Sequence, residues 1–86
     1  MSKIDDVISA LQQVADRVGE AQQATALALS ETEEALSGAQ ELGAAHTVSG
    51  LEAVRSSVES LRGQADGLKD AAESAIAQAQ SVAGGS

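Results

Sequence analysis

The sequence predicts an all-α fold in which two long antiparallel helices form a helical hairpin. The prediction rests on three features: proline is absent, 18 of the 86 residues are alanine, and apolar residues recur every three or four positions. Alanine has the highest helix propensity, and this spacing places side chains on one face of a helix. We expect helices over about 3–43 and 49–83 within a single domain of residues 1–86.

The first predicted helix has a clear start signal and a long apolar stripe. Ser2 and Asp5 have the spacing of a capping box, and Asp6 also favours the first turn. Thr25 and Thr32 stand where leucine would pack better, so we expect loose packing there, or hydroxyl groups bonded to carbonyls of the same helix. The members of the stripe are Ile4, Val7, Ile8, Leu11, Val14, Ala15, Val18, Ala21, Thr25, Ala28, Leu29, Thr32, Ala35, Leu36, Ala39 and Leu42.

The boundary between the helices is marked on both sides. Gly43 suits the C-terminal end of a helix, and Ser49 with Glu52 has the spacing of a second capping box. Alternatively, Thr47 is the cap and the second helix starts two residues earlier. Both alternatives predict a turn near residues 43–50.

The second predicted helix carries two patterns that share a period of about 3.5 residues, which is typical of coiled coils. Its apolar stripe consists of Leu51, Val54, Val58, Leu61, Ala65, Leu68, Ala72, Ala75, Ala79 and Val82. One position after each of the first seven lies a charge of alternating sign, from Glu52 to Glu73. Acid–base neighbours at such spacings stabilise an exposed helix by ~0.2–0.5 kcal/mol per pair. We expect residues 84–86 to fray.

Charges on the two predicted helices are placed to set the register of the hairpin. If the turn is centred near residue 46 or 47, antiparallel pairing brings bases of the second helix opposite acids of the first. Surface ion pairs contribute only ~0–1 kcal/mol, so their predicted role is to select register and orientation; the alternative is that they are merely solvated. The expected neighbours are Glu31 for Arg62, Glu34 and Glu41 for Arg55, and Glu20 for Lys69.

The chain is poor in core volume. It has no aromatic residue, and 18 of its 37 hydrophobic residues are alanine, which buries little apolar area. Small domains compensate with disulfides, a metal or oligomerisation, and a chain with no cysteine and one histidine lacks the ligands for the first two. The stripe on the first helix is also wider than one neighbour can cover.

We therefore expect a related helical chain to complete the core, as a homodimer or heterodimer that forms a four-helix bundle. A lone hairpin and one extended coiled coil are the alternatives. The expected function is that of a non-enzymatic adaptor or assembly protein; a surface-coating amphipathic protein and a filament or shell subunit are the rivals. The residues expected at the interface are Ile4, Ile8, Leu11, Val18, Leu51, Val54, Val58, Leu61 and Leu68.

Charge and hydropathy argue against nucleic-acid and membrane partners. A net charge of −8 repels a phosphate backbone, and no basic cluster offsets it. No apolar run approaches the ~18 residues of a membrane span. The first residues include two acids where a signal peptide needs its apolar core, so we expect a cytoplasmic protein, with signal-peptide-independent export open.

Catalytic, cofactor and metal sites are not expected. The densest acidic group, around Glu31, Glu33 and Glu34, lacks the Glu-x-x-His motif of a di-metal bundle site and is interpreted as a solvated face. The serines lack a base, because the single histidine, His46, falls in the predicted turn, where an exposed loop residue is expected.

The chain resembles the WXG100 family in being short, cysteine-free and alanine-rich, with two long predicted helices and a glycine-marked turn near its midpoint. Gly43 or Gly50 would stand for the glycine of the family's Trp-x-Gly turn, although the tryptophan and the tyrosine of the family's C-terminal export signal are both missing. The resemblance implies hairpins that dimerise into four-helix bundles and are exported by type VII secretion.

Overall fold

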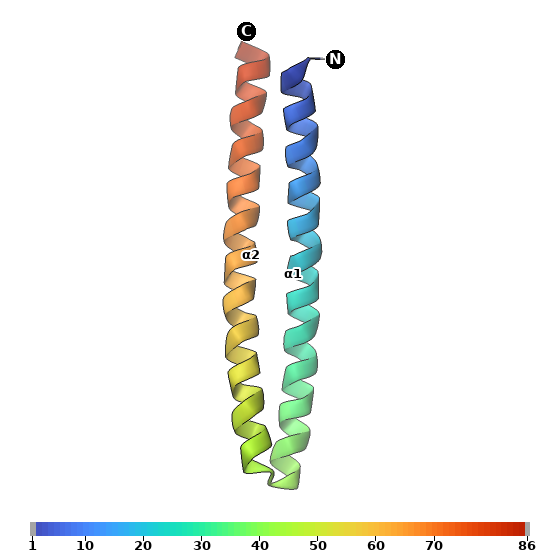
Figure 1. Ribbon diagram of the computed structural model, residues 1–86, viewed down its shortest axis with the longest axis vertical. Coiled ribbons are helices and arrows are strands. Elements are labelled where there is room, and N and C mark those ends of the chain that lie inside the picture. The colour runs from blue at the N-terminus through green and yellow to red at the C-terminus, as the bar shows by residue number, and fades with distance from the viewer. Residues whose placement is uncertain (1, 86) are drawn as a thin grey trace.

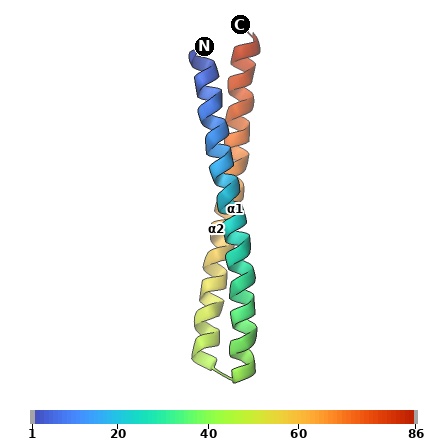
Figure 2. The ribbon, with the colours of Figure 1, turned by 90° about the vertical axis from the view of Figure 1, so that its right-hand side faces the viewer.

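The computed structural model describes residues 2–85 and consists of two α-helices packed side by side as an antiparallel hairpin (Figure 1). Helix α1 spans Lys3–Leu42 and helix α2 spans Ala45–Gly85. The Cα atoms of the hairpin extend over 65 × 16 × 12 Å. The start of α1 and the end of α2 lie at the same end of the hairpin, opposite the turn. The two helices cross as they wind along each other (Figure 2). The predicted all-α hairpin is confirmed.

Helix α1 begins as the sequence predicts. Ser2 has extended backbone angles, with φ −84° and ψ 160°, and its side-chain oxygen accepts a hydrogen bond of 3.3 Å from the backbone N–H of Asp5. The N–H of Asp6 donates to the carbonyl oxygen of Ser2 at 3.2 Å. The bond to the Ser2 side chain satisfies an N–H group that has no partner within the helix, and the bond to the Ser2 carbonyl is the first backbone bond of the helix.

The turn between the helices is much shorter than predicted. Gly43 is left-handed, with φ 69°, and its N–H donates to the carbonyl of Gln40, while the N–H of Ala44 donates to the carbonyl of Ala39, both at 3.1 Å. This pair of bonds is a Schellman motif, which ends the helix and reverses the chain within two residues. Helix α2 therefore starts at Ala45, and the turn over 43–50 is corrected to Gly43 and Ala44.

The rest of the predicted turn belongs to α2. The N–H of Val48 donates to the carbonyl of Ala44 at 2.9 Å, so the helix is already formed before the predicted caps at Thr47 and Ser49. No proline interrupts this segment, and nothing in it prevents α2 from starting directly after the turn. His46 is exposed in the first turn of α2 rather than in a loop. At the other end, α2 continues to Gly85; Ser86, the last residue of the predicted tail, lies outside the described residues.

The core between the helices is narrow and built mainly from alanine. Of the six hydrophobic residues that are buried in the described part of the chain, five are alanines, and the exception is Leu36, which is 5% exposed. Alanine side chains allow two helices to lie close together but remove little apolar area from water. The expected shortage of core volume is therefore confirmed.

Two threonines in the middle of α1 satisfy their hydroxyl groups locally. The hydroxyl of Thr25 donates to the carbonyl of Gln22 at 2.9 Å, and that of Thr32 donates to the carbonyl of Ala28 at 2.7 Å. Thr32 is buried, so its hydroxyl needs a partner there. The predicted bonds to carbonyls of the same helix are confirmed.

Candidate protein-interaction face

The apolar stripe predicted for α2 divides into two rows in the structure. The inner row faces α1 and is buried or half-buried; it consists of Leu51, Val58, Ala65, Ala72 and Ala79. The outer row of α2 is exposed except at the half-buried Ala75 and consists of Val54, Leu61, Leu68, Ala75 and Val82. Its four larger members are 46%, 53%, 60% and 62% exposed, in that order. The ten residues of the predicted stripe therefore do not form one row against α1.

On the side of α2 that contacts α1, basic side chains rather than the residues of the outer row lie between the members of the inner row. Arg55 and Lys69 are half-buried, each one position after an exposed member of the outer row. The Nζ of Lys69 donates across the hairpin to the carbonyl oxygen of Ala15 at 3.3 Å. Long aliphatic stems of lysine and arginine can cover apolar surface while their charged ends reach polar groups. Helix α2 is thus rotated so that its basic edge, rather than the whole apolar stripe, lies against α1.

The wide apolar stripe of α1 is likewise only partly covered. Its inner row is buried or half-buried and consists of Ile4, Ile8, Leu11, Ala15, Val18, Thr25, Leu29, Thr32, Leu36 and Ala39; the polar Gln22, outside the predicted stripe, is half-buried in the same row. Its outer row recurs every seven residues and consists of Val7, Val14, Ala21, Ala28, Ala35 and Leu42. Val7, Val14 and Leu42 are 47%, 50% and 84% exposed. The prediction that one neighbour cannot shield this stripe is confirmed.

The nine predicted interface residues therefore fall on two surfaces. Six of them are half-buried between α1 and α2, namely Ile4, Ile8, Leu11, Val18, Leu51 and Val58. The other three, Val54, Leu61 and Leu68, lie in the exposed outer row of α2. Contact of any of the nine with another chain stays a prediction.

The two outer rows lie on the same face of the hairpin, which we call the apolar face. An antiparallel hairpin has an approximate two-fold axis perpendicular to the plane of its helices, so equivalent positions of the heptad repeat come to one side. On the opposite edge the Nε2 of Gln22 donates to the Oδ1 of Asp66 at 2.8 Å and links the two helices there.

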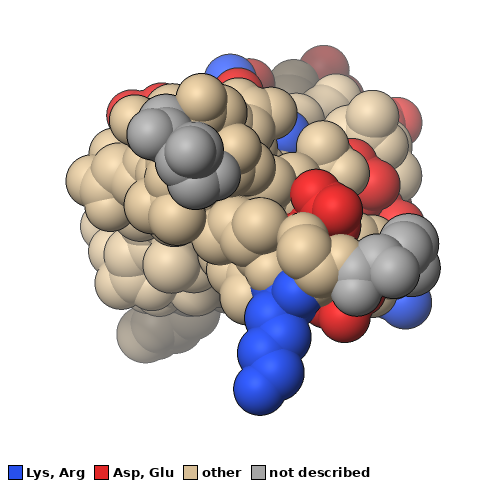
Figure 3. Space-filling model, turned by 90° about the horizontal axis from the view of Figure 1, so that it is seen from above, with Lys and Arg blue, Asp and Glu red and all other residues tan. Residues whose placement is uncertain are grey.

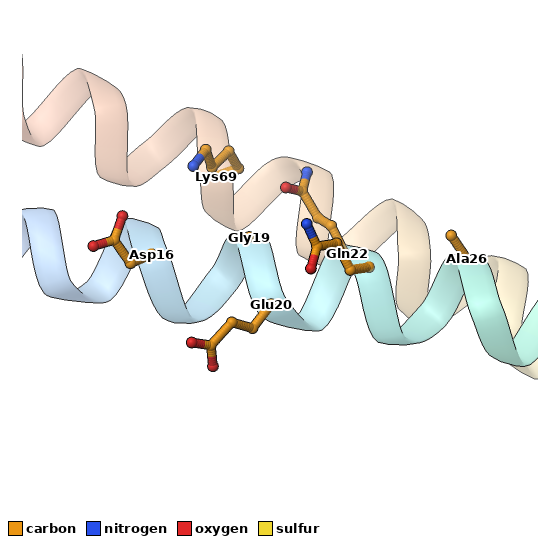
Figure 4. A pocket seen from close by; sticks show the side chains of 7 residues that line it. Asp16, Gly19, Glu20, Gln22, Ala26 and Lys69 are labelled. Atoms are coloured by element: carbon orange, nitrogen blue, oxygen red, sulfur yellow. The ribbon is translucent and has the colours of Figure 1, made fainter.

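The opposite edge is polar and contains a shallow hollow of 450 Å³ around Gly19 and Ala26 (Figure 4). The small residues leave room for the end of Lys69, whose Nζ would lie 3.8 Å from a Cβ atom added at Gly19. Figure 4 shows Glu20 pointing away from α2, into solvent. Because the hollow is open and holds no nucleophile with an adjacent base, its geometry does not indicate catalysis.

The predicted register-setting contacts are not formed. Among residues 2–85, the ion pairs join Arg17 to Glu20 at 3.6 Å and Arg55 to Glu59 at 3.9 Å, so both lie within one helix. The expected ion pairs of Arg55, Arg62 and Lys69 with acids of α1, including Glu31, are therefore wrong. They are out of register because the turn is shorter than predicted. Counting outward from Gly43 and Ala44, Arg62 lies level with Thr25, and Lys69 lies level with Val18.

Charge is distributed unevenly around the hairpin. None of the 13 acidic residues lies in either outer row. Among the residues next to an outer row on the exposed surface of its helix, four positions before each member, the one acid is Glu31. The remaining acids follow the polar edge and the back of the hairpin. The end-on view in Figure 3 shows a broad uncharged surface on its left flank, on the side of α2. The apolar face is therefore free of the charge that would oppose its burial.

Within residues 2–85, no group of three histidine or acidic side chains is placed to hold a metal ion, and neither helix has a stretch long and apolar enough to cross a membrane. The two-helix hairpin is consistent with a WXG100-like architecture. Comparisons with protein-family models, with curated proteins and with solved structures found no match to this chain.

Proposed function

We propose that this protein is a non-enzymatic helical assembly protein that binds a second helical hairpin on its apolar face and so completes a four-helix bundle. The observation that carries the proposal is the position of its exposed large hydrophobic residues. Among the described residues, seven of the eight belong to the two outer rows, and Leu27 lies elsewhere. Scattered exposed hydrophobics are ordinary on a protein surface, whereas a continuous apolar face marks an interaction site.

The surface area of the chain supports the same conclusion. Its accessible surface is 5895 Å², whereas a compact monomer of 8.6 kDa exposes about 4,700 Å². The excess is the expected result of two helices that cover each other on one side only. Docking another pair of helices on the apolar face would bury much of this excess and supply the core that alanine alone does not.

The resemblance to WXG100 proteins gives a finer version of this proposal. Hairpins of that family work as dimeric bundles linked to type VII secretion, and the architecture of this chain suits the same use. A cytoplasmic protein that leaves the cell without a cleaved signal is the corresponding proposal for its location. Detection of the tagged chain in the culture medium of its native host, dependent on that secretion system, would support this version.

The proposal is tested by affinity capture with three baits: the unaltered chain, Leu61→Glu and Ser60→Glu. Leu61 lies on the apolar face, whereas Ser60 is exposed about 100° around α2 from it and outside the outer row, so the pair adds the same charge on and off the apolar face. We expect a helical protein to be captured by the unaltered chain and by Ser60→Glu, and lost with Leu61→Glu. Equal capture by all three baits, or a monomer that melts cooperatively without any partner, would contradict the proposal.

A further inference from the structure

We propose that the hairpin bound on the apolar face is a second copy of this chain, with the two turns at the same end of the bundle. The inference rests on the proposed function and adds the identity and the orientation of the partner. It is derived from the sizes of the side chains along the two outer rows, from the area of the face and from its charge.

Along the middle of the apolar face, large residues of one outer row lie beside alanines of the other. Counting outward from Gly43 and Ala44, residues at the same count on the two helices lie level with each other. Four large members then lie two residues, or about 3 Å at 1.5 Å per residue, from the level of an alanine in the other row. These neighbours are Val54 with Ala35, Leu61 with Ala28, Leu68 with Ala21, and Val14 with Ala75. At the far end Val7 lies beside Val82, and Leu42 next to the turn has no such alanine.

This pattern is complementary to its own copy. A two-fold axis along the length of the bundle places α1 of one copy against α2 of the other, with levels preserved. Leu61 of each copy then faces the alanines of the outer row of α1 in the second copy. Val14 of each copy faces the small side chain of Ala75 in the second copy. Packing of large residues against small ones is what lets facing helices interdigitate. If the turns lay at opposite ends, Leu61 of one copy would face Leu68 of the other. The alanines of the two α1 outer rows would then face each other and leave a gap between the copies.

The area and charge of the face suit a pair of copies. The hairpin is 65 Å long and 16 Å wide, so one face covers on the order of 1,000 Å², compared with about 800 Å² per partner in a stable interface. Both copies carry a net charge of −8, which disfavours association through the polar edges. Burying the apolar faces turns the acidic surfaces outward, where salt screens their repulsion over about 8–10 Å.

The orientation is tested with spin labels at single cysteines, because the chain has no cysteine of its own. His46→Cys is exposed near the turn and Ser81→Cys is exposed near the other end. With both turns at one end, each variant gives a label distance of about 20–35 Å, which is two helix diameters plus the label arms. A mixture of the two variants then also gives a distance of about 50–60 Å, because positions 46 and 81 are 35 residues apart at 1.5 Å per residue. The reverse result, long within each variant and short in the mixture, overturns the orientation.

The identity of the face is tested by sedimentation of charge variants and size variants. Leu61→Glu should raise the dissociation constant of the dimer at least about tenfold, and Ser60→Glu less than about threefold. Ala28→Leu should also weaken the dimer, because it fills the space that Leu61 of the partner occupies. The double variant Ala28→Leu with Leu61→Ala exchanges large and small and should restore most of the affinity. An unchanged dimer in all these variants would show that another surface is used.

The two proposals fail in different ways. A monomer of 8.6 kDa at all concentrations would exclude a second copy as the partner. The proposed function would still stand if a different helical hairpin were captured and lost with Leu61→Glu. Circular dichroism on each variant shows whether it remains helical, and the size exchange introduces no charge, so loss of the dimer can be separated from loss of the fold.

Discussion

At the scale of single residues, the smallest side chains shape this molecule. Gly43 adopts a left-handed conformation with φ 69°, which is the point where the chain reverses. A residue with a Cβ atom meets its own carbonyl in this conformation, so glycine is favoured there. By contrast, Gly63 lies inside α2 with open space around the position of a Cβ atom, and the helix has no need of a glycine there.

Replacing these two glycines by alanine should therefore have opposite effects. Gly43→Ala should lower the free energy of unfolding by roughly 1–2 kcal/mol, the cost of a left-handed alanine. Gly63→Ala should raise it by up to ~1 kcal/mol, because alanine favours a helix interior. Urea unfolding followed by circular dichroism, at one protein concentration, measures both. A loss of stability in both variants would show that Gly63 has a packing role.

At the scale of the helices, each element is covered on one side only. Leu36 is the large apolar residue that the hairpin buries most completely, at 5% exposure, whereas Leu27 on the same helix is 63% exposed. Leu27 also lies outside the two outer rows. The stability of the helix pair therefore depends on few side chains, and the two leucines give a matched comparison.

We expect Leu36→Ala to destabilise the protein by about 2–5 kcal/mol, through lost burial and the cavity left behind. That is a large fraction of the stability of a small domain, so the folded baseline of the variant should shorten or vanish in urea. Leu27→Ala should change the free energy of unfolding by no more than about 0.5 kcal/mol. Similar losses in the two variants would mean that Leu27 is covered by another chain.

At the scale of the whole molecule, a net charge of −8 is spread along a thin rod rather than around a compact domain. The ion pairs among the described residues join neighbours three or four positions apart, as Arg17 does with Glu20, and leave most acids without a basic partner nearby. Exposed pairs of this kind contribute little to stability. Repulsion among the acids should therefore outweigh attraction.

Added salt is expected to stabilise the protein for this reason. Raising sodium chloride from about 10 mM to 200 mM shortens the screening length severalfold. If screening contributes about 1 kcal/mol, the melting temperature should rise by roughly 4–8 °C in a domain of this size. Glu34→Lys reduces the net charge from −8 by two units and should flatten the dependence on salt. A melting temperature that falls with salt would indicate that attractive pairs dominate.

Local interactions are what the sequence by itself determined. The start of α1 at Ser2, its end at Gly43 and the bonded hydroxyls of Thr25 and Thr32 all depend on contacts within about four residues. So does the continuous helix formation of an alanine-rich chain without proline. The width of the stripe on α1 also showed in advance that one neighbour could not cover it.

The rotation of α2 and the length of the turn were decided only by the tertiary structure. Two stripes on α2, one through Leu61 and one through Arg62, share Leu51 and Val58 and have the same spacing, so periodicity alone cannot choose between them. The choice depends on the sum of contacts along the whole of α1, including the place that Gly19 leaves for Lys69. Such contacts join residues far apart in sequence, and that is why the apolar face became visible only when both helices were in place.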